Sequence, residues 1–375
     1  MKLTKSLFLA FAGLGLFACS NEDVADNGGI QGTGMVEVTI QSPSTRSVQG
    51  STSGSSVIVG GNITVEVYSG DILQGSEVIE RNPSDSDGKT NYTVQIYGVT
   101  SPDKVVAYCN DGKAVNDAAA ISITDSRLQS EPESIPAYAE ATLSESDING
   151  EMENTSDGKV YKRYTKSLAL QIPVARIELD GLKHKAHDAD NTEEASCKFD
   201  KLFINGVYLN NIYATKNAGA VTNTYSWNET SKEGEGNFPI LYDVIGTFGV
   251  GVSFLSEEDN FPTFPQEGGK AFAYNFFAGT DKEVPELKIY FNKATAASSD
   301  NPVTSPRYAI VKSYKNESGP IDHFVPGTIY RITNVELMDK NIGPNEGGET
   351  VYGVEVTVTE ATWSVTDIEA VWEEQ

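Results

Sequence analysis

The chain has 375 residues, with 53 Asp and Glu against 28 Lys and Arg, which gives a formal net charge of −25 at pH 7. A chain of this length is long enough for two domains. A surface this acidic repels phosphate, which excludes nucleic acid as a partner, and it is typical of a soluble extracellular protein.

The chain begins with a pattern typical of a bacterial lipoprotein signal peptide. A basic start at residues 1–5 precedes a short apolar run at residues 7–17, and Ala18 and Cys19 follow. The apolar run is too short, and has the wrong flanks, for a membrane span. We therefore expect residues 1–19 to form a signal peptide that ends at Cys19. Acylation of Cys19, by palmitate for example, is expected to anchor the precursor to the outer membrane.

A second processing signal lies at the end of residues 20–46. Residues 35–40 form a strand-like segment, and Arg46 and Ser47 follow at the start of a tract of small polar residues. A lone arginine in flexible, exposed sequence is a target for an arginine-specific protease. We expect cleavage between Arg46 and Ser47 to remove residues 20–46 as a propeptide. The strand would leave with the propeptide, and an edge of its sheet would open.

Strand signals dominate the rest of the chain. Short runs rich in β-branched and aromatic residues alternate with clusters of Gly, Asn, Asp, Ser and Pro, as in an all-β sandwich. The predicted strands are residues 63–68, 92–99, 104–109, 168–174, 176–179, 201–209, 272–277, 287–292, 307–314, 330–338 and 351–359. Helices are expected only as short segments in loops, for example at residues 115–128.

The strand pattern predicts two sandwich domains, residues 47–168 and residues 169–375. A polar, acidic stretch at residues 144–159 precedes this boundary and is expected to be a loop. Pro173 lies in the strand-like run that opens the second domain. Because proline has no N–H group to donate to a ladder, Pro173 is expected at a strand edge or a bulge.

The sequence carries no motif for catalysis. His184 and His187 have the spacing of a metal site on a helix, but their Lys and Asp neighbours favour a solvated loop. Cys109 and Cys197 lie on strand-like segments, and burial as small apolar residues is favoured over a disulfide between them, which stays the alternative. The nucleophile motif of the α/β-hydrolases and the zinc motif of metalloproteases do not occur. The sequence therefore predicts no enzyme, no metal site and no cofactor.

Aromatic residues are dense between residues 225 and 277. Packing in the core of a sandwich is the favoured interpretation, because aromatic side chains bury large areas. A platform that binds carbohydrate, with Trp227 among its contacts, is the alternative. A glycan-binding surface lipoprotein is therefore an alternative function for the chain.

The C-terminal tail carries the clearest amphipathic strand. Residues 351–359 alternate between apolar and polar, which places Val354, Val356 and Val358 on one face, and Trp363 and Val365 alternate in a second segment. Such a strand ordinarily covers its own sheet. A terminal strand is also the element most easily donated to the open edge of a neighbour. Both roles remain open for this tail.

Several of these features together resemble the Bacteroidales fimbrillins, the structural subunits of type V pili. They are a lipidation motif followed by Asn21-Glu22-Asp23, the arginine processing site, the segment Pro173-Val174-Ala175-Arg176-Ile177-Glu178, and the segment Pro326-Gly327-Thr328-Ile329-Tyr330-Arg331-Ile332. The resemblance implies two tandem transthyretin-like β-sandwich domains and export as a lipoprotein. It also implies cleavage at the position of Arg46 and loss of the first strand. The C-terminal strand of a neighbouring subunit, within residues 351–372, would then fill the groove.

These features predict a non-enzymatic structural subunit of a cell-surface fimbrium that supports adhesion and biofilm formation. The expected partners are other copies of the chain and related pilin subunits, an arginine-specific protease, and an unidentified receptor on a host or bacterial surface. Within the same family, a pilus tip, an accessory adhesin or an anchor subunit is the alternative.

Overall fold

The computed structural model describes residues 34–41, 44–46, 56–58, 61–81, 91–130, 134–179, 182–184, 199–222, 240–244, 251–253, 272–279, 284–296, 302–303, 307–316, 318–332, 335–337 and 354–362. Strands dominate these residues, and the helical segments α1 (Gly112–Asp117) and η2 (Glu145–Asp147) are short. The prediction of an all-β chain with short helices is confirmed. No helix in the described part of the chain is long and apolar enough to cross a membrane.

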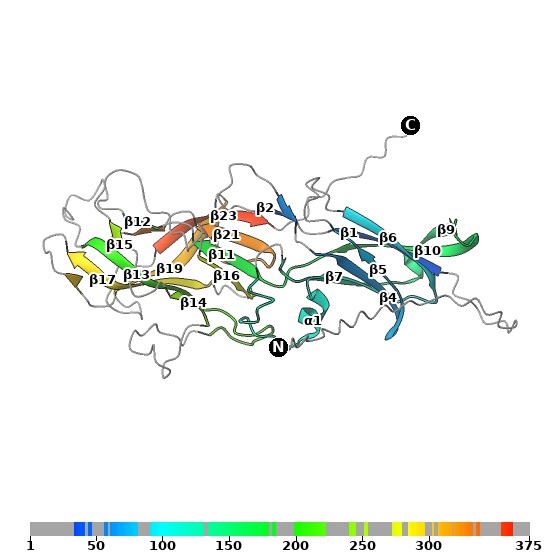
Figure 1. The fold of residues 1–375 in the computed structure, drawn as a ribbon, viewed down its shortest axis with the longest axis horizontal. Helices are drawn as coiled ribbons and strands as arrows, with labels where there is room; N and C mark the ends of the chain where they lie inside the picture. Colours follow the sequence, from blue (N-terminus) through cyan, green and yellow to red (C-terminus); the bar gives the residue numbers. More distant parts are fainter. Residues whose placement is uncertain are drawn as a thin grey trace, which may run out of the picture. The chain divides into compact units, whose positions relative to one another are not determined.

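Residues 34–169 form two four-stranded sheets, with the orders β6-β1-β10-β9 and β5-β4-β7-β8 (Figure 1). The strands are β1 (Gly34–Gln41), β4 (Ile63–Ser69), β5 (Ile72–Ile79), β6 (Asn91–Val99), β7 (Lys104–Cys109), β8 (Ala137–Thr142), β9 (Ile148–Asn154) and β10 (Lys159–Ala169). Alternate residues of β1, β4 and β7 are buried and belong to one hydrophobic cluster. This alternation is the period of a strand with one face in the core of a sandwich.

Residues 175–362 contribute a larger, eleven-stranded sheet. Its main order is β14-β13-β17-β19-β23-β21-β11-β16, and β15, β18 and β20 pair with β13, β17 and β19. The strands are β11 (Ala175–Leu179), β13 (Phe199–Asn210), β14 (Leu241–Val244), β15 (Gly251–Ser253), β16 (Phe272–Phe276), β17 (Glu286–Ala296), β18 (Pro302–Val303), β19 (Arg307–Asn316), β20 (Gly319–Ile321), β21 (Thr328–Ile332) and β23 (Val354–Thr362). Two short pairs complete the description: β2 (Ser44–Arg46) with β3 (Ser56–Ile58), and β12 (Leu182–His184) with β22 (Val335–Leu337).

The segment after α1 forms backbone hydrogen bonds with the segment that follows β13 in the chain. The N–H of Ile123 donates to the carbonyl of Ala214 at 2.9 Å, and the N–H of Lys216 donates to the carbonyl of Ile121 at 3.0 Å. These bonds use backbone groups that a longer helix would need for itself. The helix expected at residues 115–128 is therefore wrong beyond Asp117.

Two further predictions are corrected by the structure. The acidic stretch at residues 144–159, expected to be a loop, contains β9, which pairs with β10 in an antiparallel hairpin. β9 has only two large apolar side chains, Ile148 and Met152, four residues apart, and most of its residues are exposed, so no period-two alternation reveals the strand. Pro173 lies in a bend between β10 and β11 and not within a strand, because the chain leaves one sheet there to enter another.

Cys109 is buried, as predicted, and burial raises the pKa of its thiol to about 11. Cys197 and His187 lie outside the described residues. His323 is exposed. The proposed boundary between residues 47–168 and residues 169–375 stays a prediction.

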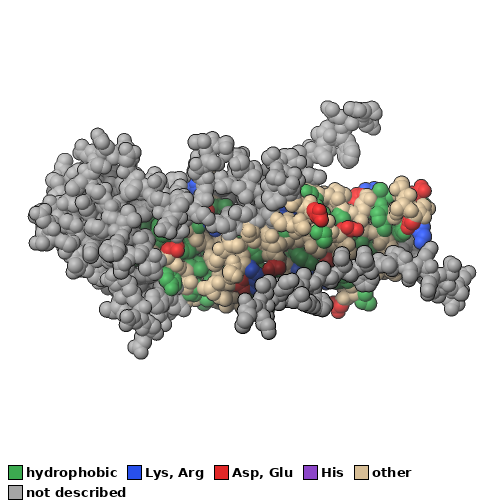
Figure 2. Space-filling view, in the orientation of Figure 1, with side chains coloured by type: hydrophobic (Ala, Val, Ile, Leu, Met, Phe, Trp, Pro, Cys, Tyr) green, Lys and Arg blue, Asp and Glu red, His purple; other side chains and the backbone are tan. Residues whose placement is uncertain are grey.

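Charged side chains are scattered over the described surface. On the face shown in Figure 2, the described Lys and Arg side chains lie singly among acidic and hydrophobic ones and form no basic patch. Phosphate contacts need clustered Lys and Arg.

Candidate functional site

The first described strand, β1, is an internal strand of its sheet. It lies between β6, to which it is antiparallel, and β10, to which it is parallel (Figure 1). Every residue from Gly34 to Gln41 is in register with a residue on each neighbour. An edge strand can leave a sheet without splitting it. Removal of β1, in contrast, separates β6 from β10 along the whole length of the strand.

The inner face of β1 is fully buried. Val36, Val38 and Ile40 have no exposed surface and belong to the hydrophobic core. Burial of side chains of this size contributes about 1.5–3 kcal/mol each. A chain that loses β1 therefore exposes a groove with an apolar floor and two rows of unpaired backbone groups.

The outer face of β1 is held by one carboxylate, Glu37. Arg163 of β10 donates from NH2 to Oε1 of Glu37 at 2.5 Å, and Gln95 of β6 donates from Nε2 to Oε2 at 2.8 Å. Partial burial raises the pKa of the Glu37 carboxyl, but the hydrogen bonds from Arg163 and Gln95 outweigh it and hold the pKa below its ordinary value. Glu37 thus ties β1 to both of its neighbours.

The strand β23, which contains three of the predicted donor residues, is also internal. It lies parallel to β19 on one side and antiparallel to β21 on the other. Val354 is in register with Val311, Val356 with Tyr314, and Val358 with Ile332. In this conformation the tail is thus part of its own sheet, the first of the two roles open to it from sequence. Trp363 and Val365 lie outside the described residues.

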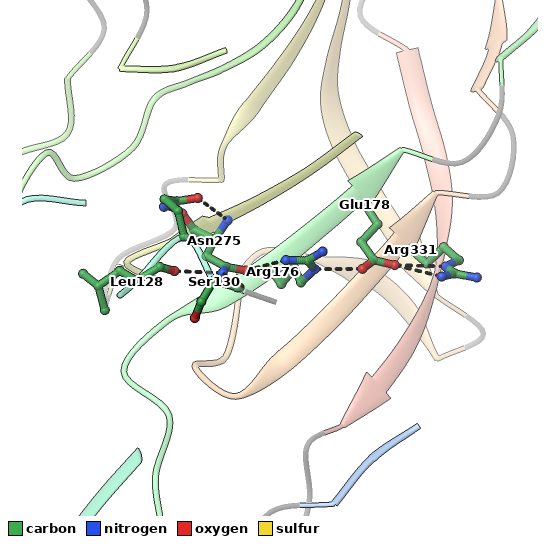
Figure 3. Close-up of polar contacts among 7 residues, drawn as sticks. Leu128, Ser130, Arg176, Glu178, Asn275 and Arg331 are labelled. Carbon is green, nitrogen blue, oxygen red and sulfur yellow. Dashed lines mark hydrogen bonds and ion pairs between the residues drawn. The ribbon is translucent and has the colours of Figure 1, made fainter. Parts of the chain in front are cut away.

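The two sequence segments that carry the resemblance, residues 173–178 and 326–332, meet in the larger sheet. Their strands β11 and β21 pair in parallel, and a buried ion-pair network connects them (Figure 3). Arg176 donates from Nε to Glu178 at 2.8 Å, and Arg331 donates from Nε and NH2 to the other oxygen of Glu178 at 3.1 and 3.0 Å. The three side chains are only 4–7% exposed.

The same network extends to the segment after α1. The guanidinium of Arg176 donates to Oδ1 of Asn275 on β16 at 3.3 Å. The amide of Asn275 in turn donates to the carbonyls of Leu128 at 2.8 Å and Ser130 at 3.0 Å (Figure 3). Because buried polar groups are costly when unpaired, this chain of bonds fixes residues 128–130 against the larger sheet.

The structure describes Arg46 of the predicted cleavage site but not Ser47. Arg46 is the last residue of β2 and is in register with Ser56 of β3. Some Cα atoms of β2 and β23 come within 8 Å of one another. Ser47 and the lipidation residue Cys19 lie outside the described residues, so cleavage and acylation stay predictions.

A pocket of about 460 Å³ lies between α1, β8 and the bend that contains Pro173. Its charged lining group Lys216 donates to the carbonyl of Asn116 at 2.7 Å, and Glu140 accepts a hydrogen bond from Tyr138 at 2.6 Å. No set of three His, Cys, Asp or Glu side chains suited to a metal ion occurs among the described residues. The described residues that line the pocket include no nucleophile paired with a base.

The aromatic stretch at residues 225–277 is described only in part. Phe272, Phe276 and Phe277 are buried in the core, as the favoured interpretation predicted, whereas Tyr242 on β14 is 40% exposed. Trp227 lies outside the described residues. The glycan-binding alternative stays a prediction.

Sequence reasoning missed the polar partners of these strands. Glu37 is visible in the sequence, but its partner Arg163 lies on β10, whose first nine residues were not predicted as a strand. Arg176 and Glu178 are two residues apart and therefore share a face of β11, a signal that was available. Their proximity to Arg331 follows only from the parallel pairing of β11 with β21.

No family model matches the sequence, and no curated protein matches it. The comparison with solved structures does find matches. A fimbrilin (FimA) from Porphyromonas gingivalis W83 matches with a TM-score of 0.51 and 12% identity, covering 90% of this chain and 99% of that one. A proposed cell adhesion protein from Parabacteroides distasonis has a TM-score of 0.48 and 12% identity, covering 88% and 100%. Another from Bacteroides eggerthii has a TM-score of 0.46 and 15% identity, covering 90% and 98%. The chain thus has the β-sandwich fold of a fimbrilin.

Proposed function

We propose that the chain is a structural subunit of a type V pilus on the cell surface, and that it polymerises by strand exchange. One observation carries this proposal: β1 is the first strand of the described chain and yet is paired along its whole length on both sides. A first strand that fills the middle of a sheet leaves a complete slot when it is removed. The fold shared with a fimbrilin supports the same role.

In the proposed pathway, the precursor is exported as a lipoprotein anchored through Cys19. An arginine-specific protease cuts after Arg46, and the detached residues 20–46 take β1 with them. The tail of a second copy, with Val354, Val356 and Val358 and then Trp363 and Val365, fills the slot. Because each copy donates one surface and accepts on another, the contact is heterologous and builds an open filament.

The position of β23 adds a second requirement to this pathway. Each of its described pairings in the monomer must be broken before the strand can be donated. Before cleavage, β1 fills the acceptor slot and β23 is paired within its own sheet. Assembly therefore depends on cleavage. Release of a donated strand would likewise require the acceptor sheet to open, and that kinetic barrier keeps an assembled filament from dissociating.

The test is assembly of the purified precursor after treatment with an arginine-specific protease. We expect a new N-terminus at Ser47 and ladders of bands on a gel in SDS without heating. Arg46→Ala is expected to prevent both the cut and the ladders. The control Arg81→Ala removes another arginine and is expected to leave both unchanged. A cut precursor that remains a monomer at high concentration would contradict the proposal.

A further inference from the structure

We propose that β23 replaces β1 of the next subunit residue for residue, with Glu355 taking the place of Glu37 on Arg163. This inference rests on the proposed function and deepens it, because it names the register of the exchanged strand and the ion pair that selects it.

The two strands share a four-residue sequence. Val36-Glu37-Val38-Thr39 of β1 is repeated as Val354-Glu355-Val356-Thr357 of β23. The next pairs, Ile40 with Val358 and Gln41 with Thr359, conserve an apolar residue followed by a polar one. Any half-buried strand alternates in this way, but the coincidence of the glutamate and the threonine is not required by alternation.

The two strands also occupy the same kind of slot. In its own sheet, β23 has a parallel neighbour, β19, and an antiparallel neighbour, β21. The slot of β1 likewise offers a parallel neighbour, β10, and an antiparallel neighbour, β6. If β23 moved from its own slot to the slot of β1, it would again have one parallel and one antiparallel neighbour.

The floor of the slot accepts the side chains of β23 in this register. Val354 and Val356 reproduce Val36 and Val38, which are fully buried. Val358 takes the place of Ile40 with one methylene group fewer, a small loss of packing. A register one residue away would turn the polar face of β23 toward the core and is excluded by burial alone.

The outer face distinguishes the remaining registers. Without Glu37, the guanidinium of Arg163 and the amide of Gln95 lose their shared acceptor. Nε of Arg163 is buried and has no hydrogen-bond partner among the described residues even while β1 is present. A carboxylate on the incoming strand would satisfy this partly exposed cation again.

Glu355 takes the place of Glu37, between Arg163 and Gln95, only in the proposed register. A shift of two residues keeps the alternation but puts Gly353 or Thr357 in the place of Glu37, in register with Thr165 of β10 and Gln95 of β6, and neither carries a charge. Only this register lets one carboxylate accept from both Arg163 and Gln95, as Glu37 does, and the shared bonds therefore select it from the set that the apolar floor accepts. Arg163 is thus the acceptor's specificity-determining residue, and Glu355 is the donor's.

Cross-linking between copies tests the register. Thr39 is in register with Thr93 of β6, which is exposed, so Thr357 of the donated strand is expected to lie opposite Thr93. After processing, the pair Thr93→Cys and Thr357→Cys is expected to form disulfide-linked ladders under oxidising conditions. The matched pair Thr93→Cys and Thr359→Cys moves the donor thiol two residues along the same face, and at least tenfold less cross-linking is expected because a disulfide tolerates little separation.

Charge exchange tests the ion pair. Glu37→Arg with Arg163→Glu reverses the pair within the precursor and preserves it there. We expect this double variant to be processed but to assemble at least tenfold more slowly, because Glu355 then meets a carboxylate. Adding Glu355→Arg is expected to restore the rate. Glu360→Arg in its place, a change on the same strand outside the repeated sequence, is expected not to restore it.

The outcomes separate the two proposals. If the processed parent forms no ladders, the proposed function fails, and the register fails with it. If the parent forms ladders but cross-links equally at residues 357 and 359, the register is overturned and strand exchange stands. Ladders that form at the parental rate in the double variant, without Glu355→Arg, overturn the role of the ion pair.

Discussion

The strands β1 and β11 occupy equivalent places in their sheets. Each has an antiparallel neighbour on one side, β6 or β16, and a parallel neighbour on the other, β10 or β21. The side chains that hold them differ. All five residues of β11 are buried, and its two charges belong to a buried network, whereas alternate residues of β1 are only half-buried and one carboxylate ties its outer face.

This difference shows how one topology serves two purposes. A buried charge that loses its partner is far more costly than a half-exposed one, so β11 cannot move without a large loss of stability. The ties of β1 are mainly apolar contacts and backbone bonds, which a strand of matching pattern can replace. The network around Glu178 fixes one strand, and the simple pattern of β1 suits exchange.

The largest effect is expected from Glu178→Ala. Removing this carboxylate leaves the guanidinium groups of Arg176 and Arg331 buried without their shared acceptor. We expect a loss of about 3–5 kcal/mol in the free energy of unfolding, measured by urea denaturation of the precursor. The exposed glutamate Glu151 provides the control, and Glu151→Ala is expected to change stability by less than about 0.5 kcal/mol. Equal effects at both positions would refute the distinction between β11 and the surface.

Asn275→Ala is expected to have the next largest effect. It removes the donor to the carbonyls of Leu128 and Ser130 and leaves both without that bond. We expect a loss of about 2 kcal/mol, because buried carbonyls without partners cost about 1–3 kcal/mol each. Amide hydrogen exchange at residues 121–130 should rise in the same variant. Asn62→Ala, at an exposed asparagine, should leave exchange there unchanged.

A double-mutant cycle between Glu37 and Arg163 measures the tie on β1. The side chains are 16% and 31% exposed, so screening by solvent limits the pair. With Glu37→Gln and Arg163→Met we expect a coupling of about 1 kcal/mol in the precursor. A coupling as large as the loss at Glu178 would show that β1 is held as firmly as β11.

The smallest effect is a change with pH at Glu37. Its native pKa is held below the ordinary value of 4.5, so the unfolded chain binds a proton there before the native chain does. The resulting stability is present above pH 4.5 and is lost as pH falls through the native pKa. Glu37→Gln is expected to make the free energy of unfolding fall less steeply below that pH. If the free energy of unfolding fell equally steeply with pH in the variant and the parent, the Glu37 carboxylate would not contribute to the pH dependence.

Local pattern was sufficient to predict many of the strands. The limits predicted for β7 agree with the structure, and the predicted segment at residues 307–314 lies within β19. These strands are rich in β-branched and aromatic residues, which have strong strand preferences. β9 and most of β10 escaped prediction because their exposed faces carry charged residues without apolar alternation. Local sequence does not specify which strands pair, so the contact of Glu37 with Arg163 required the structure.

The candidate site was predictable to a similar degree. The terminal strands were found because each is amphipathic and lies near an end of the chain. That β23 lies in the middle of its own sheet could not be read from its sequence, because an amphipathic strand fits an edge and an interior equally well. The network of Arg176, Glu178 and Arg331 depends on strands about 150 residues apart in the chain.

The parallel pairing of β1 with β10 has a consequence for any fibre that this chain builds. A strand that takes the place of β1 must run in the same direction as β10, so all subunits face the same way. The two ends of the fibre are then chemically different: one presents a vacant groove and the other an undonated tail. Growth, capping and attachment to the cell can therefore be assigned to separate ends by the direction of a single strand.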